Sequence, residues 1–318
     1  MGIKKNNDIN LSVNLSVNLG KVSLINPLIT ASGTCGYVDE LDDFLDINQL
    51  GAFITKSITI KPRLGNDVPR IVETDSGMLN AIGLANIGVE KFIQEKVPMM
   101  ERYKTPFFVN IAGQTIDEYL AVADKLSQCR RIAGLELNIS CPNVKQGGIT
   151  FGTDPALVRQ ITTEVKKVVR DKILVVKLTP SVTDISAIAR AAVECGADAL
   201  SLVNTFTAMV IDIETQKPVL ANRTGGLSGP AIKPIAVYLV NKVYNEVAKP
   251  AGVPIIGGGG IRTASDAIEF IIAGATAVTI GTGGFINPDC AVKIIQGIKD
   301  YLRRQNITAV AELIGSLK

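Results

Sequence analysis

The sequence contains no histidine and no tryptophan. The absence of histidine excludes Ser-His-Asp and Cys-His catalysis, metalloprotease chemistry of the HExxH type, and metal sites built from imidazole ligands. A general base in this chain must therefore be the side chain of a cysteine, lysine, aspartate, glutamate or tyrosine.

Cysteines are few and scattered, since the five in the chain form no CxxC pair. This spacing argues against a disulfide framework, a structural zinc site or an iron–sulfur cluster within the chain, and no metal site is expected. A reducing cytoplasm is the compartment that fits best. Residues 1–9 have no apolar run after their lysines, so they are expected to form a flexible extension and not a signal peptide. The most apolar stretch, 267–286, contains Glu269 and several glycines, so no membrane span is expected.

Nucleotide-binding signatures are also absent. Neither a GxxxxGK[ST] phosphate loop nor a GxGxxG fingerprint occurs, so direct binding of a nicotinamide nucleotide in a Rossmann unit is not expected. The net charge is +3, and lysine and arginine are scattered, which predicts no nucleic-acid surface. With 47% hydrophobic and 20% charged residues, the composition is that of a globular protein with a large core.

Short apolar runs alternate with helical patterns along the chain. The runs cover 28–31, 52–57, 107–111, 135–139, 173–178, 199–203, 254–256 and 277–280, and the helical patterns cover 39–48, 89–101, 115–129, 155–170, 184–195, 231–247, 264–273 and 288–302. This alternation predicts an α/β fold, a (β/α)8 TIM barrel forming a single domain over residues 1–318; a doubly wound open sheet is the alternative. Alternating polarity in 10–19 predicts an N-terminal strand or β-hairpin. The long connections 141–153 and 204–230 predict inserted loops at the C-terminal face.

The fourth apolar run continues into the sequence NISCPN at residues 138–143. Pro142 stops a helix or a central strand, so Asn138, Cys141 and Asn143 are expected at a strand end, where barrels hold their chemistry. A thiol between two carboxamides suggests a proton-transfer residue beside groups that hold a polar, planar ligand. The alternative is a small buried cysteine that only packs in a tight turn.

Two glycine-rich turns follow the seventh and eighth apolar runs, at 257–260 and 281–284. Glycines expose backbone N–H groups to an anion, and the loops after strands seven and eight of a barrel commonly bind phosphate. Thr263 and Asp266 have the spacing of a capping box for the following helix. The two turns together predict a phosphate site.

Lys177 lies inside the fifth apolar run. A lysine in such a position is seldom buried without a partner, so it forms either an ion pair within the barrel, for instance with Glu136, or holds its charge against an anionic ligand. Other strand ends carry further lysine, serine and asparagine side chains and few carboxylates. Such a site suits an electron-rich planar cofactor with a phosphate tail and a polar planar substrate.

These motifs resemble those of the dihydroorotate dehydrogenase family, from about Leu24 to Ile298. The resemblance rests on NAIGL at 80–84, NISCPN at 138–143, VKLTP at 176–180, GLSG at 226–229 and the two glycine turns. It implies an FMN-containing (β/α)8 barrel, an oxidoreductase acting on a CH–CH group, that oxidises dihydroorotate to orotate in pyrimidine (UMP) biosynthesis. Cysteine before Pro142 resembles the soluble class 1 enzymes, and the continuation 144–148 resembles their NAD-linked B-type subgroup.

The resemblance also implies partners. In the NAD-linked subgroup, a second subunit carries FAD and a [2Fe-2S] cluster and passes electrons to NAD+, and a homodimer of the catalytic chain sits within a heterotetramer. One alternative is the fumarate-linked class 1A homodimer, in which the same flavin is reoxidised directly. A second is a non-redox phosphate-binding barrel enzyme, such as an aldolase or isomerase with Lys177 as base or Schiff-base residue.

Finally, the resemblance implies residue roles. Cys141 would take the proton from C5 of the substrate while the hydride at C6 passes to flavin N5, and Lys177 would lie near the flavin N1–C2 carbonyl region. The other implied FMN contacts are Ser32, Lys56, Ser57, Asn110, Asn138, Val203 and Gly229, with Gly259, Gly260, Gly281 and Thr282 at the phosphate. The implied substrate contacts are Lys56, Asn80, Ala81, Ile82, Gly83, Leu84, Asn138, Asn143, Asn204 and Thr205.

Overall fold

A computed structural model describes residues 12–40, 42–139, 145–146 and 149–318. Its central feature is a parallel eight-stranded sheet in the order β3-β18-β17-β12-β11-β8-β7-β4. These strands are β3 (Leu28–Thr30), β4 (Phe53–Ile54), β7 (Phe107–Ile111), β8 (Ile132–Asn138), β11 (Ile173–Lys177), β12 (Ala199–Leu202), β17 (Ile255–Gly258) and β18 (Ala277–Ile280). Ile29 of β3 forms a parallel bridge with Ala52, next to β4, so the two edges meet and the sheet closes.

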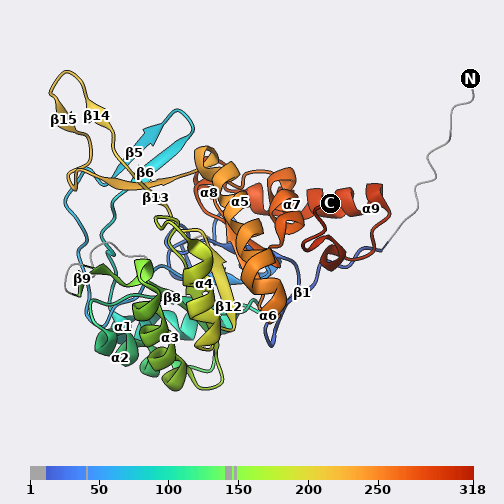
Figure 1. Cartoon of the computed structure of the whole chain (residues 1–318), viewed down its shortest axis with the longest axis horizontal. Helices are drawn as coiled ribbons and strands as arrows, with labels where there is room; N and C mark the ends of the chain where they lie inside the picture. The colour runs from blue at the N-terminus through green and yellow to red at the C-terminus, as the bar shows by residue number, and fades with distance from the viewer. Residues whose placement is uncertain (1–11, 41, 140–144, 147–148) are drawn as a thin grey trace, which may run out of the picture.

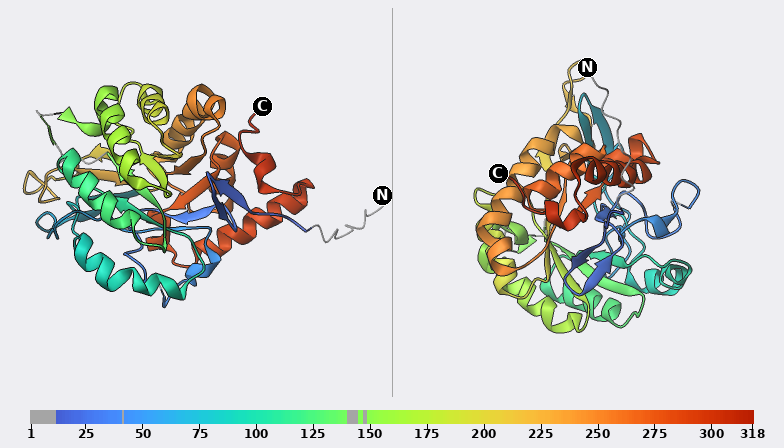
Figure 2. Two further views of the ribbon diagram at one scale, coloured as in Figure 1. Left: turned by 90° about the horizontal axis from the view of Figure 1, so that it is seen from below. Right: turned by 90° about the vertical axis from the view of Figure 1, so that its right-hand side faces the viewer.

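Helices surround this sheet, as Figure 1 and the right-hand view of Figure 2 show. They are α1 (Val89–Lys91), which continues through η2 (Phe92–Lys96) and η3 (Pro98–Arg102), α2 (Ile116–Ser127), α3 (Pro155–Val169), α4 (Ile185–Glu194), α5 (Lys233–Val243), which continues through η6 (Tyr244–Ala248) into α6 (Lys249–Ala251), α7 (Ala264–Ala273), α8 (Thr282–Ile286) and α9 (Cys290–Gln305). Apolar side chains on one face of α3, including Val158, Ile161 and Val165, are buried against the barrel. The predicted (β/α)8 barrel is confirmed, and the open doubly wound sheet is wrong.

The helix predicted over 39–48 is wrong. The described residues there form turns and one short 3₁₀ helix, η1 (Ile47–Gln49). The Glu40 carboxylate accepts hydrogen bonds from the backbone N–H groups of Tyr37 and Val38, at 2.9 and 3.0 Å. The Asp46 carboxylate accepts one from the backbone N–H of η1. Acidic side chains that bind nearby backbone amides compete with helix formation, so the local pattern of apolar residues was misleading.

The predicted N-terminal hairpin is present as the antiparallel pair β1 (Val17–Leu19) and β2 (Val22–Leu24). Gly20 occupies the turn with a φ of 58°, which favours glycine. Leu19 and Leu24 are fully buried and belong to the main core, so one face of the hairpin packs on the barrel. Figure 2 shows the hairpin beside α9, near the end of the chain.

The connections after β4 and β12 carry strands of their own; the one after β12 was predicted as an inserted loop, whereas the one after β4 was not. β5 (Ile71–Thr74) and β6 (Gly77–Asn80) follow β4, whereas β13 (Phe206–Ala208) and β16 (Gly225–Ser228) follow β12. The four strands form one antiparallel sheet in the order β13-β16-β6-β5, which we call the cap sheet. It projects beside the hairpin of β14 (Ile211–Asp212) and β15 (Lys217–Pro218), at the opposite end of the molecule from α9 (Figure 1). The connection after β8 contains the short pair β9 (Lys145–Gln146) and β10 (Ile149–Thr150).

The core lies between the barrel strands and their helices, with a small separate cluster under the cap sheet formed by Leu79, Ala81 and Leu220. Each fully buried phenylalanine or leucine in such a core contributes about 1.5–3 kcal/mol. None of the helices in the described part of the chain has the length and apolar character that crossing a membrane requires. Over the same residues, no three Asp, Glu or Cys side chains gather as metal ligands would.

Candidate active site

A cavity of about 510 Å³ lies at the carboxyl ends of the barrel strands. Barrel residues such as Lys177 and Gly258 line one side of it, and cap-sheet residues such as Asn80 and Gly226 line the other. Its volume is within the range of small-molecule and cofactor sites. The cap sheet therefore encloses the end of the barrel at which this fold places its chemistry.

The structure brings most of the predicted site residues together in this cavity. Its lining includes Ser32, Lys56, Ser57, Asn80, Ala81, Ile82, Gly83, Leu84, Asn138, Lys177, Val203, Asn204, Thr205, Gly229, Gly259, Gly260, Gly281 and Thr282. Asn110 is fully buried and lies behind this lining. Cys141 and Asn143 lie outside the described residues.

The two glycine turns follow the neighbouring strands β17 and β18, and both line the cavity. Gly260 has a φ of 83°, and a Cβ there would come within 2.7 Å of the Gly229 carbonyl oxygen, so only glycine fits. Gly281 is the N-cap of α8, and Thr282 Oγ1 donates a hydrogen bond to Ser228 Oγ at 2.8 Å. Backbone N–H groups and hydroxyls without side-chain cover suit a phosphate.

The predicted capping box of α7 is present. The Asp266 carboxylate accepts hydrogen bonds from the backbone N–H groups of Arg262 and Thr263, at 3.0 and 2.9 Å, and the Thr263 hydroxyl accepts one from the Asp266 N–H. These groups are therefore occupied by the helix itself, which leaves the pair of glycine turns as the candidate anion-binding part of this region.

A polar network forms part of the barrel side of the cavity lining, in the inner layer that apolar side chains usually fill in a barrel. Lys177 Nζ donates to Ser32 Oγ at 2.9 Å and lies 3.9 Å from Glu136 Oε2. Asn110 Nδ2 donates to the same Glu136 oxygen, and Ser57 Oγ donates to Asn110 Oδ1. The two predicted roles of Lys177, an ion pair within the barrel and a charge facing a ligand, are compatible. Lys177 forms an ion pair with Glu136 and also lines the cavity.

Lys56 is a second cation in the lining. Burial, and secondarily the positive charge of Arg70, lower the pKa of Lys56 from its ordinary value. An anion that binds beside a partly desolvated ammonium stabilises the charged form of the amine. The segment 80–84, which begins at the end of β6, lines the same cavity.

Two carboxamides meet on the barrel side. Asn204 Nδ2 lies 3.4 Å from Asn138 Oδ1, and the backbone carbonyl of Asn138 accepts a hydrogen bond from the Tyr119 hydroxyl at 2.7 Å. Asn138 ends β8 and Asn204 follows β12, so both are held by rigid strands. They offer donors and acceptors to a planar polar ligand.

Sequence reasoning missed several lining residues, including Ser201, Ser228 and Thr279. Ser201 and Thr279 stand inside apolar strands, where a small polar residue at alternate positions is a signal for the inward face. Ser228 carries no such local signal, because the cap sheet alone brings it to Thr282.

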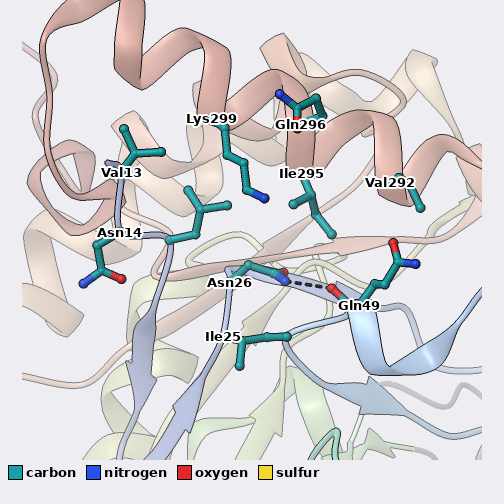
Figure 3. Close-up of a pocket in the computed structure, with 10 residues that line it drawn as sticks. Val13, Asn14, Ile25, Asn26, Gln49, Val292, Ile295, Gln296 and Lys299 are labelled. Atoms are coloured by element: carbon teal, nitrogen blue, oxygen red, sulfur yellow. Dashed lines mark hydrogen bonds between the residues drawn. The ribbon is translucent and has the colours of Figure 1, made fainter. Parts of the chain in front are cut away.

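A second cavity of about 470 Å³ lies at the other end of the barrel, among the N-terminal segment, the residues that precede β3 and β4, and helix α9 (Figure 3). There Asn26 Nδ2 donates to the Gln49 carbonyl at 2.8 Å, and Lys299 supplies the charge. None of the predicted site residues lines this cavity. The candidate active site is therefore the cavity under the cap sheet.

The chain is similar in sequence to known proteins over nearly its whole length. The family model described as dihydroorotate dehydrogenase matches residues 14–302. A protein of Pelobacter propionicus is 52% identical over 304 residues, covering 96% of this chain and 98% of that protein. A protein of Geotalea daltonii is 53% identical with the same coverage, and one of Alkaliphilus oremlandii is 52% identical over 96% of this chain and 99% of its own length. All three are named dihydroorotate dehydrogenase B (NAD(+)), catalytic subunit. This chain belongs to the dihydroorotate dehydrogenase family.

Proposed function

We propose that this chain is an FMN-dependent catalytic subunit that oxidises dihydroorotate to orotate in pyrimidine biosynthesis and passes the electrons to a partner subunit. The observation that carries the proposal is the single cavity that joins a glycine cradle to two lysines and several carboxamides. The names of the relatives support the NAD-linked form. The proposal includes FAD and a [2Fe-2S] cluster on the partner, a homodimer of this chain within a heterotetramer, a cytoplasmic location, and one FMN-binding domain over residues 1–318.

The residues present fit FMN. The glycine turns at 259–260 and 281–282 would hold its phosphate, since a side chain at Gly260 would fill the cradle. Lys177 would lie against the flavin ring, with Ser32, Ser57, Asn138, Val203 and Gly229 around it. When bound, FMN supplies the hydride acceptor of the reaction.

The chain's own residues would do the remaining work. The Lys56 ammonium would bind the substrate carboxylate, and the amides of 80–84 with Asn138 and Asn204 would orient the ring. Cys141 would take the proton from C5, with Asn143 beside the substrate. An unperturbed thiol has a pKa of about 8.5, so the closed site must favour the thiolate or exclude water when Cys141 acts.

The alternatives gain less support. The fumarate-linked form is not favoured, because the relatives described above carry the NAD-linked name. A non-redox enzyme with Lys177 as Schiff-base residue needs a neutral amine, whereas Lys177 lies in an ion pair with Glu136.

The proposed division of labour is tested with electron acceptors. The purified chain should oxidise dihydroorotate with an artificial dye but not with NAD+, because it has no dinucleotide fingerprint. Co-expression with the partner subunit should add NAD+ reduction, and fumarate should not replace NAD+. Rapid NAD+ reduction by the single chain, free of any second subunit, would contradict the proposal, and a colourless folded protein would contradict FMN binding.

Lys56→Met should weaken the binding of orotate by about tenfold to a hundredfold, because a hydrogen bond to a charged group is worth about 1.5–3 kcal/mol. In the parent, orotate affinity should fall as the pH rises through the lowered pKa of Lys56, because the ammonium then loses its charge. That decline should be missing in the variant. Titration of the flavin spectrum with orotate measures both effects, and Lys61→Met, at an exposed residue outside the cavity, is the control. Equal affinities in parent and Lys56→Met would remove Lys56 from the substrate site.

A further inference from the structure

Glu136 is the buried carboxylate of the polar network. It lies in the middle of β8, its residue is 0% exposed, and it contributes to the lining of the cavity. One carboxylate oxygen accepts from Asn110, and the other, Oε1, is buried without a hydrogen-bond partner among the described residues. Removing a carboxylate from water costs free energy, and this cost must be offset by interactions of Glu136 within the protein.

The ion pair with Lys177 does not by itself explain why a carboxylate is buried here, because such a pair adds little to the stability of the fold. The two charged groups are 3.9 Å apart, and the side chains are 1% and 12% exposed. A buried ion pair contributes little net stability, because desolvation of both charges offsets their attraction, and apolar residues of similar size often do as well. The carboxylate beside Lys177 is better explained by an electrostatic effect on the ligand that occupies the cavity.

We propose that Glu136 is a positioning residue that holds the Lys177 ammonium toward the flavin and, through its own negative charge, lowers the tendency of the flavin to accept electrons. This inference rests on the proposed function, since it concerns the FMN of that site. It assigns to Glu136 a role separate from binding the substrate, because the contacts of its carboxylate are with Lys177 and Asn110.

The sign of the effect follows from electrostatics. A flavin that has accepted a hydride carries one more negative charge than the oxidised flavin. Lys177 favours that charge, whereas Glu136, in the same desolvated layer, opposes it. The Ser57–Asn110 chain holds the Glu136 carboxylate in place from the other side, so its charge has a fixed position relative to the cavity.

Glu136→Gln keeps the size of the side chain and removes the charge. A single charge within about 4–6 Å shifts a protonation equilibrium by about tenfold or more, and we expect an effect of that order on the flavin. The variant should therefore favour the reduced flavin about tenfold more than the parent, which is ~30 mV toward positive potential for a two-electron couple. The measurement is the midpoint potential of the flavin in the full chain, by equilibration with a reference dye and without dihydroorotate.

Asp198→Asn is the matched control. Asp198 forms an ion pair with Lys166 at 2.6 Å, and it precedes β12, at the end of the barrel away from the cavity. Its substitution should leave the potential unchanged. Glu136→Asp, which keeps the charge but withdraws it by one methylene, should give a potential between those of the parent and Glu136→Gln. Lys177→Gln should shift the potential in the negative direction.

Several outcomes would overturn the inference. One is an unchanged potential in Glu136→Gln, and another is an equal shift in Asp198→Asn. A third is loss of flavin from both Glu136 variants, which would show that Glu136 is needed for the fold of the site and not for the potential. If only Glu136→Gln loses its flavin, Glu136→Asp decides, and an unshifted potential there rejects the role. Failure of the proposed function looks different, because the parent would then bind no FMN or its FMN would not be reduced by dihydroorotate.

Discussion

Replacing Cys141 by alanine should slow the reduction of bound FMN by dihydroorotate by about a hundredfold to ten-thousandfold, which is the usual cost of losing a general base. The chain has no histidine, and Cys141 is the titratable side chain in the sequence NISCPN at 138–143. FMN content should be retained, because the glycine turns that would hold the phosphate follow β17 and β18 and not β8. Rapid mixing with dihydroorotate, followed by flavin bleaching, measures the rate.

The pH dependence separates a base from a packing residue. In the parent, the rate should rise with pH as the thiolate fraction grows, and Cys141→Ser should be slow at neutral pH and gain more from raised pH. Cys129→Ala is the control, because Cys129 is a partly buried free cysteine that lies just after α2, outside the cavity lining. A Cys141→Ala variant that bleaches within a few-fold of the parent rate would show that the base lies elsewhere.

Gly281→Asp should yield a folded protein that has lost most of its FMN. An added Cβ would lie 3.3 Å from the Ala31 Cβ, so a side chain fits with a small adjustment. An aspartate carboxylate at the N-cap of α8 would stand near the first N–H groups of that helix, where its charge would repel the phosphate. Because phosphate and carboxylate would compete for the same amides, we expect the affinity for FMN to fall by at least about tenfold, of the order of 1.4 kcal/mol. The ratio of flavin absorbance to protein measures the loss.

Gly252→Asp is the control for the added charge. Gly252 ends α6 with a φ of 66°, which aspartate tolerates better than most residues, and no atom lies within 4 Å of a Cβ built there. This variant should keep its FMN and its thermal unfolding temperature close to those of the parent. Full flavin content in Gly281→Asp, or equal losses in both variants, would count against the glycine turns as the phosphate site.

Local patterns were sufficient for the barrel. Each predicted barrel strand is present within a few residues of its expected bounds, because strands buried on both faces read as continuous apolar runs. The stretch 39–48 was the exception among the helices, since carboxylates such as Glu40 bind nearby backbone amides there instead of continuing a helix.

The candidate site was predictable where its residues follow strands. The carboxyl ends of parallel strands meet at one end of a barrel, so Lys56, Lys177 and Asn204 could be placed together before their distances were known. Asn110 also lies at a strand end, but its side chain forms hydrogen bonds with Ser57 and Glu136 and does not line the cavity. Whether a strand-end side chain reaches a cavity depends on its neighbours on adjacent strands.

The sequence by itself thus determined the barrel, the glycine turns and the family, because apolar periodicity and short motifs are local properties of the chain. Only the tertiary structure decided that β6 and β16 pair, with Asn80 opposite Gly226 across 146 positions of the chain, and that Glu136 stands between Asn110 and Lys177. The physical reason is that backbone hydrogen-bonding groups are the same at nearly every residue. Which strands pair, and in which register, therefore depends on how distant segments bury their side chains together.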